Sequence, residues 1–292
     1  MKAVLVTYTY PGAEKWIPAF VRSVLKQTSQ NFDVIAFQDE VDYSPYFSKL
    51  NSFKSVVLNG CASPFEVRKV SLNQLKKIGA DRVIVFADID DELSKDRIKI
   101  TLERFVEPDV GLLVSNFETI DSTGSVLEPS YWGERLPLKF TANEILDFNF
   151  CGFGNVAIRP VLIQENIPSA PLIASDWFFF YGLLKDSGIV AHGDDRAMIR
   201  YRQHSENESG LGLIAPEKLS KALDVVILHF KALNNRYSEG IYAERVNELS
   251  KLKVIFQNEE QFLETFDKVS KMIPKHRFWW EEINYLRKLV KL

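Results

Sequence analysis

The first 115 residues alternate short apolar runs with segments whose apolar residues recur at helical spacing, and this alternation restricts the fold more than any other feature. The runs of strand length are 3–7, 32–37, 53–58, 82–87 and 110–115. The segments with helical spacing between them are 14–27, 64–78 and 96–105. Repeated strand–helix–strand units predict an α/β fold with a mainly parallel sheet covered by helices on both faces.

The pattern changes along the second half of the chain. Residues 121–124 indicate a turn, and the capping box at 141–144 predicts a short helix. A helix over 176–185 and two short strands, 189–191 and 197–201, follow. After Pro216 the apolar spacing is helical throughout. We therefore expect an α/β domain over 1–215 and a helical region over 216–292.

Charge and composition exclude several functions. Lys plus Arg number 36 and Asp plus Glu 39, which gives a net charge of −3 and no electrostatic reason to coat nucleic acid. Two cysteines, Cys61 and Cys151, cannot form a disulfide scaffold. The apolar start is too short for a signal peptide, and no apolar stretch is long enough to span a bilayer. We expect a cytoplasmic chain.

Acidic side chains stand where the expected strands end. Asp39 closes the second strand, and Asp88, Asp90 and Asp91 follow the most apolar one. In an open parallel sheet, ligands bind beyond the carboxyl ends of the strands. Three neighbouring carboxylates with no adjacent cation suit Mg²⁺ or Mn²⁺ bound together with substrate phosphates. The alternative is a solvated acidic turn that caps the next helix.

An ordered set of motifs makes the assignment more specific. It comprises VLVTYTYPGAEKWIPAFVRSVLKQT, FDVIAFQDE, RVIVFADIDDELSKDRI, FCGFGNVAIR, SDW and YRQHSEN. Together they resemble an inverting, non-processive family-2 glycosyltransferase of GT-A fold over residues 1–210. The resemblance implies a Rossmann-like, mostly parallel mixed sheet with helices on both faces, followed by a C-terminal helical appendage.

The resemblance also implies a reaction. One sugar moves from a nucleotide donor, with UDP the expected nucleotide, to a hydroxyl of a glycan or glycolipid acceptor, with inversion and with Mn²⁺ or Mg²⁺. Asp90 is the expected main metal ligand, Asp91 its support, and Asp88 a contact to the ribose or the metal. His204 is a further ligand or phosphate contact, or else an ordinary loop histidine. Asp176 is the expected general base, or only a helix cap.

The remaining site residues divide between donor and acceptor. The resemblance places Asp39 at the uracil or ribose, with an ordinary loop acid as the alternative, and Thr7 and Tyr8 around the base pocket. Arg68 either faces the nucleotide or is a solvated helix charge. The expected acceptor or sugar contacts are Trp132, Gly152, Asn155 and Trp177. For the two tryptophans, packing in the core is the alternative.

The sequence departs from the family pattern at three positions. Thr9, Gln38 and Ser175 stand where the family usually has Asn, Asp and an acidic residue. These changes bear on contacts to the nucleotide more than on the reaction. The absence of a Gln-x-x-Arg-Trp motif points away from processive synthases.

The last helical segment offers an apolar stripe with basic ends. The stripe consists of Trp279, Ile283, Leu286 and Val290. It fits peripheral contact with the inner face of a membrane, which would suit a lipid-linked acceptor. Packing against the α/β domain or against a second subunit, as in a homodimer, is the alternative.

Two other functions are compatible with the sequence. A haloacid-dehalogenase-like phosphatase also needs an apolar strand running into Asp-x-Asp, but that motif normally opens the chain. A non-catalytic sugar-nucleotide-binding scaffold is the second, and Thr9 and Ser175 are the features that favour it.

Overall fold

The computed structural model describes residues 1–61, 63–163, 172–204, 216–257 and 277–289. The chain divides into two compact units. The sheet unit comprises Met1–Leu146, Phe150–Ser169 and Phe179–Gln203. The helical unit comprises Asp147–Asn149, Ala170–Phe178 and His204–Leu292. The domain boundary expected near residue 215 lies outside the described residues.

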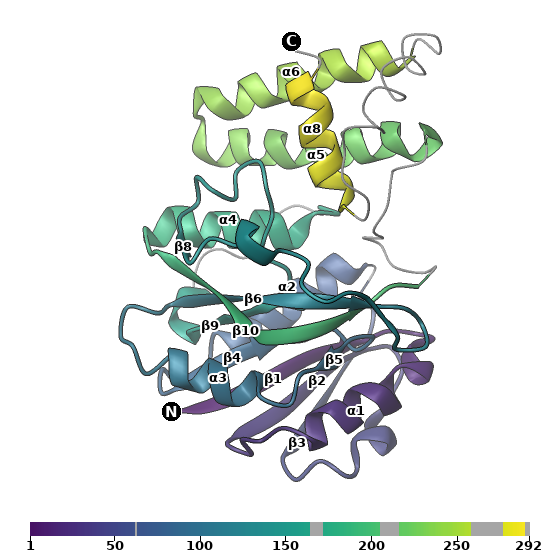
Figure 1. Cartoon of the computed structure of the whole chain (residues 1–292), viewed down its shortest axis with the longest axis vertical. Helices are drawn as coiled ribbons and strands as arrows, with labels where there is room; N and C mark the ends of the chain where they lie inside the picture. Colours follow the sequence, from purple (N-terminus) through teal and green to yellow (C-terminus); the bar gives the residue numbers. More distant parts are fainter. Residues whose placement is uncertain (62, 164–171, 205–215, 258–276, 290–292) are drawn as a thin grey trace. The chain divides into compact units, whose positions relative to one another are not determined.

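The sheet unit is built on one mixed sheet (Figure 1). Its strands are β1 (Lys2–Thr9), β2 (Phe32–Asp39), β3 (Phe53–Leu58), β4 (Arg82–Phe86), β5 (Glu92–Leu93), β6 (Leu112–Ile120), β7 (Val126–Glu128), β8 (Lys139–Phe140), β9 (Val156–Ile158) and β10 (Ala191–Arg202). The order is β3-β2-β1-β4-β9-β6-β10-β5, with β7 beside β6 and β8 beside β10. Strands β3, β2, β1 and β4 are mutually parallel, and β10 is parallel to β6, whereas β9 is antiparallel to both its neighbours.

Helices cover both faces of the sheet, as the strand–helix alternation predicts. The helices and 3₁₀ turns of this unit are η1 (Ala13–Lys15), α1 (Ile17–Leu25), η2 (Ser44–Phe47), α2 (Pro64–Leu75), α3 (Arg97–Arg104), η3 (Gly133–Arg135), η4 (Pro160–Ile163) and the second part of α4 (Ser175–Ser187). One core packs α1 and α3 against alternate residues of β1, β2 and β4. On the other face, Phe153 joins Phe86 of β4 to Phe179 of α4.

Two expectations for the middle of the chain are wrong. The capping box at Thr141 forms, because Glu144 Oε2 accepts from the Thr141 amide at 2.6 Å, yet it closes a turn and no helix follows. The two short strands expected at 189–191 and 197–201 are instead one strand, β10, with a register irregularity between Asp194 and Ile199. The irregularity breaks the period-2 pattern that would have marked a single strand.

The amino ends of three parallel strands carry a compact ion cluster. Asp33 on β2 accepts from Lys2 Nζ at 2.5 Å and from Arg82 Nη1 at 2.6 Å. Ser52 also donates to it. Burial alone would raise the pKa of Asp33, but the hydrogen bonds from Lys2, Ser52 and Arg82 prevail and lower it to about 2.

The helical unit contains α5 (Pro216–Tyr237), α6 (Gly240–Gln257), α8 (Trp279–Leu289) and the first residues of α4. Ile283 and Leu286 of α8 are each 2% exposed, and α8 packs on α5 and α6. The apolar stripe of the last helix therefore serves packing, while Val290 lies outside the described residues. No helix among those described has the length and apolar character needed to cross a bilayer.

Candidate functional site

The acidic turn, residues 88–91, begins two residues after the last residue of β4, at the carboxyl ends of the parallel strands. Asp88 and Asp90 are partly exposed, whereas Asp91 is 1% exposed. Burial, and then the charges of Asp90 and Asp88, raise the pKa of Asp91 well above its usual value. Asp91 Oδ1 accepts from the backbone amide of Arg202 at 2.9 Å. Its other oxygen, Oδ2, is buried and has no hydrogen-bond partner in the described part of the chain.

Two arginines distant in sequence reach this turn, which the sequence alone left without a cation. Arg68 of α2 donates to Asp88 Oδ1 at 3.1 Å, and its guanidinium carbon lies 3.4 Å from the centre of the Tyr8 ring. Arg202 of β10 donates from Nε to the backbone oxygen of Asp90 at 2.9 Å. Arg68 therefore pairs with the acidic turn and is not a solvated charge on the helix surface.

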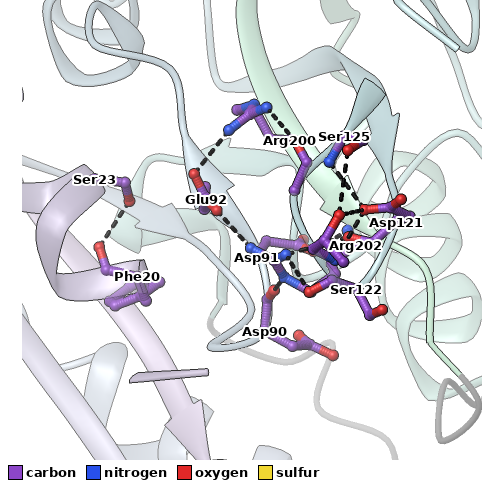
Figure 2. A network of polar contacts seen from close by, with 12 residues as sticks. Phe20, Ser23, Asp90, Asp91, Glu92, Asp121, Ser122, Ser125, Arg200 and Arg202 are labelled. Carbon is purple, nitrogen blue, oxygen red and sulfur yellow. Dashed lines mark hydrogen bonds and ion pairs between the residues drawn. The ribbon is translucent and has the colours of Figure 1, made fainter. Parts of the chain in front are cut away.

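Arg202 joins the acidic turn to a second turn (Figure 2). Its Nη1 donates to the backbone oxygens of Asp121 and Ser122, both at 3.2 Å, and its Nη2 pairs with Glu92 at 2.5 Å. Sequence reasoning missed Arg202 as a site residue, although it lies in the Tyr-Arg-x-His segment that carried the resemblance. Only the tertiary pairing of β10 with β5 reveals its role.

The segment after the acidic turn is also held from α1. Ser23 Oγ accepts from the Leu93 amide at 3.0 Å, and Gln27 both donates to Ser94 O at 2.7 Å and accepts from Ile98 N at 3.0 Å. The Ser-Val-Leu-Lys-Gln-Thr motif therefore binds the segment that leads from the acidic turn into α3. This gives the motif a physical role that its sequence does not reveal.

Gly154 leaves the space in front of the carboxylates open. A Cβ at this position would lie 2.6 Å from Asp88 Oδ2 and 3.4 Å from Asp91 Oδ2. These two oxygens consequently face the same point beside the 154 backbone. Gly154 is a second site residue that sequence reasoning missed, and the only signal for it was its place in the glycine-containing segment.

The expected nucleotide contacts lie at the same edge of the sheet. Thr7 and Tyr8 are buried at the end of β1, and Thr7 Oγ1 has no hydrogen-bond partner among the described residues. Burial, followed by the charge of Glu40, raises the pKa of Asp39 at the end of β2. Gln38 has a different function, because it is fully buried and its Oε1 accepts from the Tyr43 amide at 2.5 Å. This departure from the family pattern thus organises the loop after β2.

Several expected acceptor residues hold the chain together. Asn155 accepts from the Gly152 amide at 2.8 Å and donates to Phe150 O and Ser115 O at 3.0 and 3.2 Å. Trp132 is 2% exposed and packs edge-on against Phe150 at 5.1 Å. The burial and ring contact of Trp132 favour its packing alternative. The hydrogen bonds of Asn155, one of them with Gly152, stabilise the loop that contains Gly154.

The remaining expected residues belong to the helical unit. Asp176 stands at the start of α4, and its Oδ1 accepts from the Trp177 amide at 2.7 Å. Trp177 is 2% exposed and stacks on His229 with ring centres 4.4 Å apart. His204 is partly buried at the edge of the described residues. Packing is again the favoured role for Trp177, whereas Asp176 lies within the first turn of α4 and its carboxylate accepts from one amide of that turn.

The donor chemistry of the turn fits a hard divalent cation. Within the described residues, no group of three His, Cys, Asp or Glu side chains is already arranged around a metal position. Magnesium-type sites, however, commonly use one or two carboxylates and complete their shell with substrate phosphates and water. Asp91 supplies an unpartnered, buried oxygen beside a second acidic side chain, which is such a partial set.

Comparison with known proteins supports the architecture. No family model matches the chain. In sequence, it is 25% identical over 195 residues to WfgD of Escherichia coli, a UDP-Glc:alpha-D-GlcNAc-diphosphoundecaprenol beta-1,3-glucosyltransferase. The match covers 65% of this chain and 74% of WfgD.

Solved structures of similar fold include TarS 1-349 of S. aureus, with a TM-score of 0.57 and 19% identity over 85% of this chain and 69% of that one. TarS 1-349 in complex with UDP-GlcNAc has a TM-score of 0.59 and 16% identity, covering 100% and 92%. GalNAc-T7 with UDP, GalNAc and Mn²⁺ has a TM-score of 0.52 and 11% identity, covering 70% and 44%.

These neighbours are glycosyltransferases of GT-A fold, so the expected fold is confirmed. The sheet order places the acidic motif after β4, beside β1, and the phosphatase alternative finds no support in this architecture. Sequence relative and structural neighbours together identify the chain as a glycosyltransferase of GT-A fold, similar to family 2.

Proposed function

We propose that this enzyme moves one sugar from a UDP-sugar to a hydroxyl of a lipid-linked glycan, with inversion and with a bound divalent cation. The observation that carries the proposal is the buried, unpartnered oxygen of Asp91 beside Asp88 at the carboxyl end of β4. UDP as the nucleotide and a lipid-linked acceptor are suggested by TarS bound to UDP-GlcNAc and by the diphosphoundecaprenol substrate of WfgD.

The donor would bind along the ends of β1, β2 and β4. Asp39 would contact the base or the ribose, and Thr7 and Tyr8 would shape the base pocket. Arg68, already stacked on Tyr8 and paired with Asp88, would orient that carboxylate toward the ribose. Asp90 and Asp91, with His204 as a further ligand, would hold Mn²⁺ or Mg²⁺, which supplies positive charge to neutralise the leaving diphosphate.

Transfer itself needs a base on the acceptor side. In the proposed reaction, the Asp176 carboxylate accepts the proton of the acceptor hydroxyl. At the same time, the oxygen of that hydroxyl bonds to the anomeric carbon of the donor sugar. The bond from that carbon to the diphosphate oxygen breaks, and its electron pair leaves with UDP. Attack opposite to the leaving group inverts the anomeric configuration. The hydrogen bond from the Trp177 amide fixes one oxygen of this carboxylate.

The test is a transfer assay with UDP-glucose, UDP-galactose and UDP-N-acetylhexosamines, using polyprenyl-diphosphate-linked sugars as acceptors. We expect transfer with one donor in the presence of Mn²⁺, and a product whose anomeric configuration, read by NMR, is opposite to that of the donor. Retention of configuration would exclude the proposed mechanism.

The role of Asp176 is tested separately. Asp176→Asn keeps the cap acceptor, so we expect it to preserve donor binding and to abolish transfer. Loss of donor binding in this variant would indicate a structural cap only. Binding of UDP with Mn²⁺ by the native chain without any transfer or donor hydrolysis would favour the non-catalytic scaffold.

A further inference from the structure

A chain of ion pairs runs across three strands beside the acidic turn. Figure 2 shows three of its members, Arg200, Glu92 and Arg202. Arg200 of β10 donates from Nε to Glu118 on β6 at 2.6 Å and from Nη1 to Glu92 on β5 at 2.9 Å. Its Nη2 donates to the backbone oxygen of Gly124 at 2.9 Å. Glu92 also pairs with Arg202 at 2.5 Å. We call Glu118, Arg200, Glu92 and Arg202 the charge ladder.

Strand register explains why the ladder forms. Arg200 is the direct partner of Glu92 in the antiparallel β10–β5 pair and of Glu118 in the parallel β10–β6 pair. Opposite charges at directly paired positions attract, and the planar guanidinium can serve both carboxylates at once. Burial alone would lower the pKa of Arg200, but its own hydrogen bonds and ion pairs with Glu118 and Glu92 outweigh burial and raise it.

The ladder ends at the proposed cation site. Glu92 is the residue after Asp91, and Arg202 contacts both Asp90 and Asp91 through its side chain and its backbone amide. The side chain of Arg202 is 4% exposed, so its orientation depends on Glu92 and on the backbone oxygens of the 121–122 turn. Without Arg200, Glu92 would lose one of its two arginine partners. Its interaction with the other partner, Arg202, would then change.

We propose that Arg200 is a positioning residue that sets the divalent-cation affinity of the acidic turn, through Glu92 and Arg202. This inference rests on the proposed function, because it assigns a role in the same site. Arg200 neutralises the charges of Glu92 and Glu118, so the hydrogen bonds of Arg202 to Asp90 and Asp91 keep their geometry. The second oxygen of Asp91 then stays directed toward the space beside Gly154. Partners of metal ligands in other proteins act in this way.

The experiment measures Mn²⁺ uptake directly, by the loss of the free-Mn²⁺ electron paramagnetic resonance signal in the presence of saturating UDP. Arg200→Gln should raise the Mn²⁺ concentration for half saturation by ~10- to 100-fold, the range typical of such partners. Arg200→Lys should fall between Gln and the native residue, because an ammonium cannot bridge both carboxylates in the same plane. Arg196→Gln is the matched control, since Arg196 lies on the same strand and pairs with Asp194 instead.

Each outcome bears on the proposal. An Arg200→Gln variant with native Tm and an unshifted Mn²⁺ midpoint would overturn it, as would an equal shift in Arg196→Gln. If Arg200→Gln fails to fold, Glu118→Gln removes only the outer carboxylate and should still shift the midpoint by a few-fold, and no shift there would overturn the inference. A native protein that takes up neither UDP nor Mn²⁺ would overturn the proposed function as well.

Discussion

Aspartates at the two ends of the parallel strands have pKa shifts in opposite directions. At the amino ends, Asp33 receives hydrogen bonds from Lys2, Ser52 and Arg82, and its pKa falls to about 2. At the carboxyl ends, Asp91 is buried beside two other carboxylates, and its pKa rises well above the usual value. A paired carboxylate stabilises the fold, whereas a buried one with an unpartnered oxygen costs stability and is ready for a ligand.

The largest expected effect is at the carboxyl end. Asp91→Asn keeps an acceptor for the Arg202 amide but removes the buried negative charge. We expect Mn²⁺-dependent UDP affinity to fall by about 100-fold or more, because a charged oxygen ligand is lost. The free energy of unfolding without ligand should stay the same or rise, since an unpartnered buried charge is removed. Calorimetric titration and urea unfolding measure the two quantities.

A side chain at position 154 should weaken the same site by filling it. In Gly154→Ala, the new Cβ would lie 2.6 Å from Asp88 Oδ2, so that carboxylate must move. We expect UDP affinity to fall by roughly 10-fold, or about 1.4 kcal/mol. Gly240→Ala is the control, because a Cβ there meets nothing within 4 Å. Equal UDP affinity of the native protein and Gly154→Ala would show that the space beside Gly154 is not used.

The amino end should show the reverse pattern. Asp33→Asn should lower the free energy of unfolding at pH 7 by about 1–2 kcal/mol, because the ionised form is favoured in the folded state. UDP affinity should not change. Since the pKa of Asp33 is lowered from 3.8 to about 2, this stability is present above about pH 4 and is lost as the pH falls toward 2. Unfolding curves of the two proteins should therefore converge near pH 2.

The smallest effect concerns pH at the carboxyl end. The raised pKa of Asp91 means that protons compete with a cation for this carboxylate as the pH falls. We expect the Mn²⁺ requirement of UDP binding to increase below neutral pH in the native protein and to change less in Asp91→Asn. Identical pH profiles for the two proteins, measured by calorimetry between pH 5 and 8, would assign the competition to another group.

The same comparison explains what the sequence could predict. Apolar runs and capping signals are local features of the sequence. The positions of β1 to β4 along the chain, and of the acidic turn after β4, could therefore be predicted from spacing alone. Arg202 and Arg200 acquire their roles only when β10 pairs with β5 and β6, and Arg200 lies 108 residues from Glu92 and 82 from Glu118. Gly154 reaches the acidic turn because β9, which follows it, pairs with β4. Burial also reassigned Trp132 and Trp177 toward packing, because an aromatic residue in sequence does not reveal which face it occupies.

The central claim is that the acidic turn binds a divalent cation together with a nucleoside diphosphate. Calorimetric titration of the native protein with UDP, once with Mn²⁺ and once with a chelator, tests it most directly. We expect binding heat with Mn²⁺ and at least a tenfold weaker affinity with the chelator. Equal affinity under both conditions, or no binding under either, would contradict it.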